Sequence, residues 1–374
     1  MSWIHFFILF AQGFLLAVIL TPIMRKIAPA VGFLDQPGHR KVHANAKPLL
    51  GGAAIYFAFI ICIIGDLGVL YWLFHSNVSL PGWFGEQLSQ AAPYASGVAR
   101  VWGQLLGLLG GATLLFVLGL FDDRYGMHPF IKLGGQMLAA IILYFVGIQI
   151  ALFIDHPFIN FMLTFGWIVL LTNSFNLLDN MDGLSGGVAM ICLLLLGIST
   201  HMVSNQTFMS SMSFVLAGCI AGFLRYNLNP SSIFMGDAGS MVLGFLVSAL
   251  TIQSTFYQTG TENATAWSVV MPIVILAVPL FDTVSVILIR VRNGKPIFEG
   301  DKNHFSHRLV ALGMSHRRAV FFIHLLTLAV GSSALVLPLV DGPFGAYVIL
   351  SQTLILFILI SMLEVVSHQH NGHE

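Results

Sequence analysis

The chain has 374 residues, of which 57% are hydrophobic and only 9% are charged. Soluble domains carry roughly 25% charged residues, so this composition excludes a water-soluble fold of this length. The formal net charge is zero, which excludes nucleic acid as a partner held by a basic field. Composition and charge therefore predict an integral membrane protein, with the lipid bilayer as its surroundings.

Long stretches without charge recur along the whole sequence, and each is close to the length of about 20 apolar residues that a bilayer-crossing helix needs. They predict an all-α polytopic protein with about eleven transmembrane helices. No composition shift or repeat marks a second domain, so residues 1–374 are expected to form a single membrane domain. The expected spans lie within 1–24, 48–65, 101–121, 133–154, 156–178, 183–224 (two spans), 238–261, 263–281, 319–340 and 342–363.

The basic residues set the expected orientation, because loops rich in Lys and Arg stay on the cytoplasmic side. With the N-terminus outside, every Lys and Arg except Arg100 falls on that side or at a helix end facing it. The same loops hold the polar motifs, so one membrane face is expected to carry the chemistry. The cytoplasmic segments are expected at 25–48, 122–132, 179–183, 225–237, 290–318 and the C-terminal tail.

The first two cytoplasmic loops carry basic and acidic side chains, respectively. Lys41, His43 and Lys47 precede a Pro-x-x-Gly-Gly turn and can donate to phosphate oxygens, although orientation alone also accounts for basic residues there. Asp122 and Asp123 directly follow a span. Neighbouring helical side chains point about 100° apart, so we expect one carboxylate to hold a cation and the other to face a substrate or a lysine. A solvated helix end is the alternative.

The next two motifs add oxygen-bearing side chains. Asn176, Asp179 and Asp182 are three residues apart, so on a continuous helix they form one polar stripe that emerges from the membrane. Such a stripe suits a hard cation or a ligand, whereas helix capping needs only one residue of this kind. Asp237 is expected either to cap the following helix or to supply a further carboxylate. Phe234 is expected either to stack on a planar base or to anchor the membrane boundary.

The last motif is a loop with Lys302, His304, His307 and Arg308. Positive-inside bias explains its Lys and Arg but not its two histidines, and the set is typical of an anion-binding loop. Asp282 lies inside an expected span, where an acid is either functional or paired with a neighbouring helix. Carboxylates opposite Lys, His and Arg are the groups that a magnesium-dependent phosphoryl transfer needs.

In order and spacing, these motifs resemble the polyprenyl-phosphate N-acetylhexosamine-1-phosphate transferases (glycosyltransferase family 4) over nearly the whole chain. The motifs that carry the resemblance are Phe-Asp-Asp at 121–123, Asn-Leu-Leu-Asp-Asn-Met-Asp-Gly at 176–183, Phe-Met-Gly-Asp-Ala-Gly-Ser at 234–240 and the histidine loop.

The chain is most similar to the bacterial branch that transfers GlcNAc-1-phosphate from UDP-GlcNAc to undecaprenyl phosphate and releases UMP, which starts a cell-envelope polysaccharide. The resemblance implies Mg²⁺ as cofactor, with Mn²⁺ able to substitute. It also implies an active site at the cytoplasmic face of the bacterial inner membrane. The oligomeric state is left open, with a homodimer as one option.

The resemblance also implies roles for individual residues. Asp237 matches the principal Mg²⁺ ligand, and Asn176 and Asp179 match residues near the metal and the diphosphate. Asp122 and Asp123 match an acidic pair, of which one orients or deprotonates the lipid phosphate and the other positions the metal or a basic partner. The remaining matches are Asp182 to a nucleoside contact, Phe234 to an aromatic that stacks on uracil, and His304 and His307 to the ends of a histidine motif near the phosphates and sugar. The basic residues of the first and last loops are expected to hold the anionic substrates because of their anion-binding composition: Lys41, His43, Lys47, Lys302 and Arg308.

Two departures from the family pattern bear on the donor. The middle of the histidine motif is Ser306, and the lysine that peptidoglycan-branch enzymes carry before the Pro-x-x-Gly-Gly turn has no clear match among the first-loop basic residues. Both argue against UDP-MurNAc-pentapeptide, which stays an alternative donor beside other UDP-HexNAc sugars. A secondary transporter is the rival from another class, disfavoured because the acids lie at one face and not at the midplane. Double displacement through an aspartyl-phosphate also stays open beside direct transfer.

Overall fold

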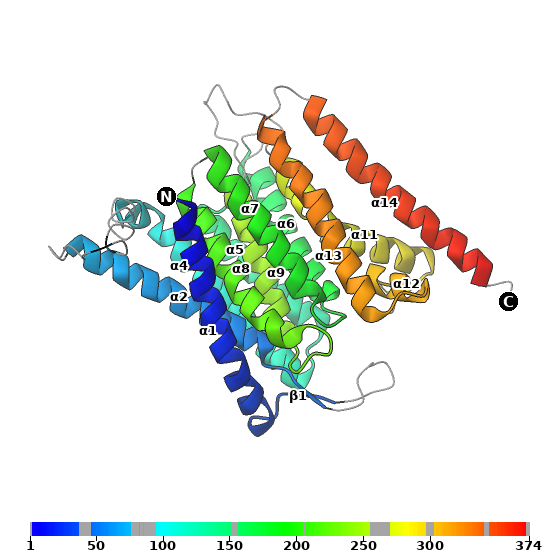
Figure 1. Ribbon diagram of the computed structural model, residues 1–374, viewed down its shortest axis with the longest axis horizontal. Helices are drawn as coiled ribbons and strands as arrows, with labels where there is room; N and C mark the ends of the chain where they lie inside the picture. The colour runs from blue at the N-terminus through cyan, green and yellow to red at the C-terminus, as the bar shows by residue number, and fades with distance from the viewer. Residues whose placement is uncertain are drawn as a thin grey trace.

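The computed structural model describes residues 2–36, 46–75, 82, 85, 95–150, 156–204, 206–254, 270–296, 303–339 and 344–371. Within these ranges the chain is almost entirely helical, with one short two-stranded hairpin (Figure 1). The elements are α1 (Trp3–Ala30), β1 (Leu34–Asp35), β2 (Lys47–Pro48), α2 (Gly51–His75), α4 (Ala95–Tyr125), α5 (Pro129–Phe145), α6 (Pro157–Leu178), α7 (Leu184–Ser204), α8 (Thr207–Asn227), α9 (Asp237–Gln253), α10 (Val270–Ile275), α11 (Ala277–Arg292), α12 (Phe305–Ala311), α13 (His316–Ser333), η3 (Ala334–Leu339) and α14 (Phe344–Asn371).

The expected apolar stretches all overlap helices in the described residues, the stretch 263–281 through α10 and the first part of α11. Eight of the described helices are long and apolar enough to cross a membrane, and α5 and α9 are shorter apolar helices. The prediction of an all-α polytopic membrane protein is therefore confirmed. The number of crossings and the outside position of the N-terminus stay predictions.

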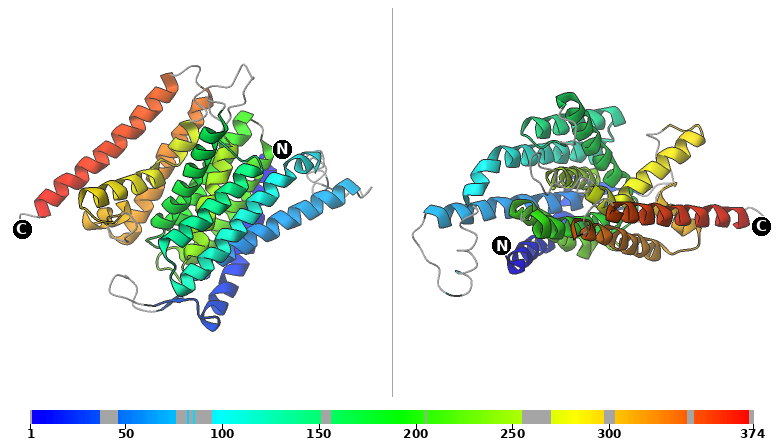
Figure 2. Two further views of the ribbon diagram at one scale, coloured as in Figure 1. Left: turned by 180° about the vertical axis from the view of Figure 1, so that it is seen from behind. Right: turned by 90° about the horizontal axis from the view of Figure 1, so that it is seen from above.

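The outer helices turn apolar side chains away from the protein. Phe7 on α1 is 71% exposed and Leu363 on α14 is 67% exposed, although residues of this kind are usually buried in soluble proteins. Lipid tails are as apolar as these side chains, so their exposure is favourable only inside a bilayer. Figure 2 shows α14 at the edge of the bundle. The chain is thus a multi-pass membrane protein.

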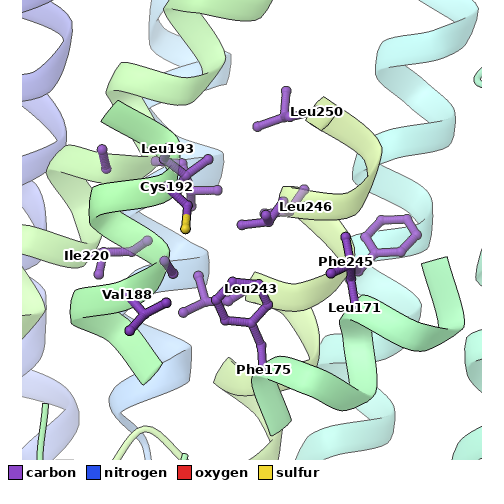
Figure 3. Close-up of a cluster of buried hydrophobic side chains, with 14 of the residues drawn as sticks. Leu171, Phe175, Val188, Cys192, Leu193, Ile220, Leu243, Phe245, Leu246 and Leu250 are labelled. Atoms are coloured by element: carbon purple, nitrogen blue, oxygen red, sulfur yellow. The ribbon is translucent and has the colours of Figure 1, made fainter. Parts of the chain in front are cut away.

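Helix α9 forms the centre of the bundle. Every residue from Ala238 to Ile252 is buried, and α2, α4, α6, α7 and α8 all pack against it. The close-up in Figure 3 shows how apolar side chains from neighbouring helices fill the space around α9. The labelled side chains are Leu171 and Phe175 of α6, Val188, Cys192 and Leu193 of α7, Ile220 of α8, and Leu243, Phe245, Leu246 and Leu250 of α9.

Small residues fix the first turn of α9 against two neighbours. A Cβ built on Gly52 of α2 would lie 2.2 Å from the backbone nitrogen of Gly239, and one on Gly119 of α4 would lie 2.3 Å from the Cα of Ala238. Both distances are far shorter than any real contact, so only glycine allows these helices to approach α9 so closely. The start of α9 is therefore held between α2 and α4.

The loop before α9 is held by backbone hydrogen bonds. The Phe234 N–H donates to the Pro48 carbonyl at 2.8 Å, and the Gly51 and Gly52 N–H groups donate to the Phe234 and Met235 carbonyls at 2.9 and 2.8 Å. Strand β2 pairs antiparallel with β1, with Lys47 opposite Asp35. These bonds fix the loop in front of α9 and place Lys47 and Phe234 beside one another.

Candidate active site

Four helices bring polar side chains together at the first residue of α9. The Lys132 ammonium of α5 donates to Asp122 Oδ2 of α4 and to Asp237 Oδ2 of α9, at 2.6 Å in each case. Asn176 of α6 donates from Nδ2 to Asp237 Oδ1 at 3.0 Å and to Ser240 Oγ at 2.9 Å. We call the carboxylates of Asp122, Asp123, Asp179 and Asp237 the acid cluster.

The adjacent carboxylates Asp122 and Asp123 have different partners. Asp122 is the one that faces a lysine, as expected for one member of the pair, and a cation held by the other stays a prediction. Asp122 faces Lys132 and also accepts the Met127 N–H at 2.6 Å. Asp123 accepts the N–H groups of Asp237 and Ala238 at 2.8 and 3.1 Å, so it caps α9 from another helix. Gly236, with φ of 75°, is the residue preceding α9. Because Asp123 supplies the cap, the Asp237 carboxylate is left to serve the cluster.

The Asp179 carboxylate has no hydrogen-bond donor among the described residues. Burial, and then the negative charges of Asp237, Asp123 and Asp182, raise the pKa of Asp179 well above its ordinary value. A raised carboxylate pKa means that the charged form lacks a compensating partner here. When its four carboxyls are ionised, the cluster holds more negative charge than Lys132 neutralises.

The donor set of the acid cluster fits a hard divalent cation. Mg²⁺ takes oxygen ligands and usually binds through one or two protein carboxylates together with substrate phosphates and water. In the described ranges, no three His, Cys, Asp or Glu side chains form a ready cation site. This arrangement suits an ion that arrives with a phosphate ligand better than one held by the protein alone.

A second polar group, here named the loop cluster, contains Asp182, Lys47, Ser231 and Phe234. Asp182 accepts the Ser231 hydroxyl at 2.7 Å, the Ser231 N–H at 3.1 Å and the Asn229 amide at 2.9 Å. Lys47 Nζ donates to Ser231 Oγ at 2.9 Å and lies 4.8 Å from the Phe234 ring centre. This pairing of a cation and an aromatic ring gives the loop cluster a charged and a stacking surface side by side.

The prediction of one helical stripe through Asn176, Asp179 and Asp182 is wrong. Helix α6 ends at Leu178, and Asp179 has a non-helical backbone. The following turn is stabilised instead by the Gly183 N–H, which donates to Asn227 Oδ1 of α8 at 3.0 Å. As a result, Asn176 contacts the acid cluster while Asp182 belongs to the loop cluster, with Asp179 between them.

The histidine motif forms the short helix α12 and the residue before it. His304 is buried, and its Nδ1 lies 3.0 Å from Asp282 Oδ2 of α11. Asp282 therefore pairs with a neighbouring element, which was one of the two roles expected for it. The His307 ring centre is 6.5 Å from that of His304. Ser306 donates to Asn180 Oδ1 at 2.6 Å, which attaches α12 to the turn that carries Asp179.

Arg308 has its guanidinium nitrogens engaged within the protein. Nε donates to Glu364 of α14 at 3.1 Å, Nη1 to the Asn303 carbonyl at 2.8 Å and Nη2 to the Ser285 hydroxyl at 3.0 Å. These bonds link α12 to α14, and a substrate-binding role for Arg308 stays a prediction. Three other predicted substrate-binding residues lie outside the described residues: Lys41, His43 and Lys302.

Sequence reasoning missed Lys132, which looked like one more residue of the positive-inside pattern. The available signal was its position in the first turn of an apolar helix, on the loop that begins with the acidic pair. Sequence reasoning also missed Gln136, one turn further along α5, which is buried and exchanges amide hydrogen bonds with Asn173 of α6 at 2.6 and 3.3 Å. This pair fixes α5 against α6 next to the site.

Comparison with known proteins places these motifs in a family. The model of glycosyl transferase family 4 matches residues 105–255. The chain is 33% identical to a probable undecaprenyl-phosphate N-acetylglucosaminyl 1-phosphate transferase of Bacillus subtilis, over 97% of this chain and 92% of the relative.

Two further relatives show the same likeness. The chain is 30% identical to a decaprenyl-phosphate N-acetylglucosaminephosphotransferase of Mycobacterium leprae, over 82% of this chain and 77% of the relative. It is also 30% identical to an undecaprenyl-phosphate alpha-N-acetylglucosaminyl 1-phosphate transferase of Haemophilus influenzae, over 85% and 81%. With the matched segment containing the acid cluster, the chain belongs to glycosyl transferase family 4, the family of the polyprenyl-phosphate N-acetylhexosamine-1-phosphate transferases.

Proposed function

We propose that this protein transfers GlcNAc-1-phosphate from UDP-GlcNAc to undecaprenyl phosphate and releases UMP. The lipid-linked diphosphate sugar then starts a cell-envelope polysaccharide. The observation that carries the proposal is the acid cluster, in which Lys132 joins Asp122 to Asp237 at the start of the central helix. The names of the relatives support GlcNAc-1-phosphate as the transferred group.

In the proposed reaction, an oxygen of the lipid phosphate attacks the sugar-linked phosphorus of the donor. The new phosphorus–oxygen bond forms as the bond to the bridging oxygen breaks, and UMP leaves with that electron pair. The second pKa of a phosphate monoester is about 6, so most of the acceptor is already dianionic at neutral pH. A general base therefore contributes little, and positioning of the two phosphates contributes most.

The surroundings of Asp122 agree with positioning rather than proton removal. Its two oxygens already accept hydrogen bonds from Lys132 and the Met127 N–H. In this proposal Asp122 keeps Lys132 in place, and the lysine ammonium is available to phosphate oxygens once substrate enters. Asp237 and Asp179 would hold Mg²⁺, with Mn²⁺ as a substitute, and the bound ion supplies charge neutralisation on the donor diphosphate and the leaving phosphate.

The loop cluster is the proposed site for the nucleoside. Phe234 offers a ring for the uracil face, and Lys47 is held beside it by Ser231. Asp182 fixes Ser231 and Asn229, so it keeps the loop in a form ready for the base. His304 and His307 are proposed to contact the sugar or its phosphates. The protein is proposed to lie in the bacterial inner membrane with this site facing the cytoplasm, where positive-inside bias places the loops.

The proposal is tested with the purified full-length protein in detergent or nanodiscs. UDP-GlcNAc, undecaprenyl phosphate and Mg²⁺ are supplied, and UMP release is measured together with the lipid product. We expect release that depends on both substrates and that stops when a chelator removes the divalent ion. Absence of UMP release with every UDP-HexNAc would reject the enzyme assignment.

Donor and acceptor arms refine the assignment. UDP-GalNAc and UDP-MurNAc-pentapeptide replace UDP-GlcNAc in parallel reactions, and decaprenyl phosphate replaces undecaprenyl phosphate, because one relative is named for that acceptor. The proposal expects UDP-GlcNAc to give the highest kcat/KM. A higher value for another donor would keep the transferase and replace its substrate.

A further inference from the structure

Asp282 is a buried carboxylate beside the histidine motif. It is 1% exposed, and each of its oxygens has a partner at the start of α12. Oδ1 accepts the Phe305 N–H at 2.6 Å, and Oδ2 lies 3.0 Å from His304 Nδ1. A group on α11 therefore fixes both the backbone and the ring of the histidine motif.

The two bonds together determine the tautomer of the His304 ring, that is, which ring nitrogen carries the proton. An ionised carboxylate only accepts hydrogen bonds, so Nδ1 carries a proton where it faces Asp282. Because Phe305 N–H occupies Oδ1, the other oxygen is the one turned toward the ring. In the neutral ring, Nε2 is then the accepting nitrogen, and it has no partner among the described residues.

The ring held in this way is attached to the acid cluster through one further contact. Ser306, two residues after His304, donates to Asn180 Oδ1 at 2.6 Å. Asn180 directly follows Asp179, whose carboxylate accepts no hydrogen bond from the part of the chain that the structure describes. Contacts from Asp282 to α12 and from α12 to Asn180 therefore fix the position of His304 relative to the turn that carries Asp179.

We infer that Asp282 is a positioning residue that fixes the tautomer and orientation of His304 for the transfer reaction. Capping of α12 alone requires only the Phe305 N–H bond, yet the second oxygen is used on the ring. The inference rests on the proposed function, in which His304 contacts the substrates. Carboxylates that orient a histidine in this manner typically change activity by about 10–100-fold when replaced.

A double-mutant cycle tests whether Asp282 acts through His304. Asp282→Asn keeps an oxygen for the Phe305 N–H but turns an NH₂ group toward Nδ1, which favours the wrong tautomer. We expect a fall in kcat of about 10–100-fold, with the KM for UDP-GlcNAc changed by less than about threefold. In a His304→Ala background, Asp282→Asn should cause no further loss. An equal loss in both backgrounds would reduce Asp282 to a structural role.

Thr283→Val is the matched control on the same helix, because it removes a buried hydrogen bond to Ser174 Oγ without touching α12. It should leave kcat within about twofold of the unchanged protein, as expected for a group outside the site. A loss in this control equal to that of Asp282→Asn would show that any disturbance of α11 lowers activity, and would overturn the inference.

A spectroscopic measurement separates this inference from the proposed function. In protein labelled with ¹⁵N-histidine, the His304 signals are assigned by their absence in His304→Ala. Nδ1 should be protonated in the unchanged protein, and Asp282→Asn should move the proton to Nε2. An unprotonated Nδ1 in the unchanged protein overturns the inference even if Asp282→Asn cannot be purified. Failure of UDP-GlcNAc as donor would reject the proposed function and leave this measurement valid.

Discussion

The turn between α6 and α7 carries two carboxylates three residues apart whose surroundings are opposite. Asp182 accepts three hydrogen bonds from Asn229 and Ser231, whereas Asp179 accepts none from the described residues and faces other carboxylates. A satisfied carboxylate stabilises the fold in which it is found. An unsatisfied one near like charges costs stability and is retained where a ligand supplies the missing cation. The loop cluster is thus built by the protein alone, and the acid cluster is left incomplete.

The largest expected effect comes from the centre of the acid cluster. Asp237→Asn keeps the shape of the side chain and removes its charge, so we expect activity to fall by at least about 10³-fold. Transfer activity at saturating Mg²⁺ and the thermal unfolding midpoint are both measured. Asp66→Asn is the matched control, because Asp66 of α2 pairs with Gln12 of α1 outside the site. Full activity of Asp237→Asn would show that the acid cluster is not needed for the reaction, and would contradict the contrast between the two clusters.

Lys132→Met tests whether a cation is needed between Asp122 and Asp237. Without the ammonium the two carboxylates repel one another, so we expect activity to fall about 10²-fold and the metal-free protein to unfold at a lower temperature. Added Mg²⁺ should raise the unfolding midpoint more in this variant than in the unchanged protein. Lys295→Met, at an exposed position after α11, is the control. An identical Mg²⁺ response in both variants would argue against an ion at the acid cluster.

Asp179→Asn addresses the unsatisfied member of the turn. It removes a carboxyl that has no hydrogen-bond donor within the described ranges and whose ionisation is unfavourable, so the unfolding midpoint without metal should stay equal or rise. The Mg²⁺ concentration for half-maximal activity should increase about tenfold, because one oxygen ligand has lost its charge. Titrations of activity and of the unfolding midpoint with Mg²⁺ measure both effects. A lower midpoint together with an unchanged Mg²⁺ requirement would mean that Asp179 is an ordinary structural residue.

Asp182→Asn is the corresponding change at the satisfied member and has the smallest expected effect on turnover. Its new NH₂ group opposes the donors of Asn229 and Ser231, so the unfolding midpoint should fall. We expect kcat within about threefold and a KM for UDP-GlcNAc raised by up to about tenfold, since the loop cluster contacts the nucleoside in our proposal. If both Asn variants shift the midpoint in the same direction, the contrast between the two carboxylates is lost.

The sequence was sufficient to predict the membrane helices. Charge-free stretches indicate membrane helices because lipid tolerates few charges, and the eight described helices that are long and apolar enough to cross a membrane all overlap such stretches. The acid cluster also followed from motif order, since Asp122, Asp123, Asn176 and Asp237 meet at one helix end. Local patterns failed where tertiary contacts decide. The turn after Leu178 depends on Asn227 of α8, which no periodicity of α6 reveals.

Charge partners were also beyond sequence reasoning. Lys132 and Arg308 are both basic residues near helix ends, yet one bridges two acids of the site and the other pairs with Glu364 of a peripheral helix. Positive-inside bias accounts equally for both, so their roles separate only in three dimensions. Asp282 was left with two outcomes for the same reason, because its partner His304 is 22 positions away along the chain.

The close contacts between the backbone of α9 and those of α2 and α4 affect how the results of mutational surveys of this protein should be interpreted. Gly52, Gly119 and Gly239 carry no functional group, but the addition of one methyl group at any of them forces the helices apart. Such a displacement moves Asp237 away from Asp123 and Lys132, which sit on the neighbouring helices. Inactive variants at these glycines would therefore reflect a change in the distance between helices. A survey that assigns every intolerant position to the active site would wrongly include these three glycines, which have no chemical role.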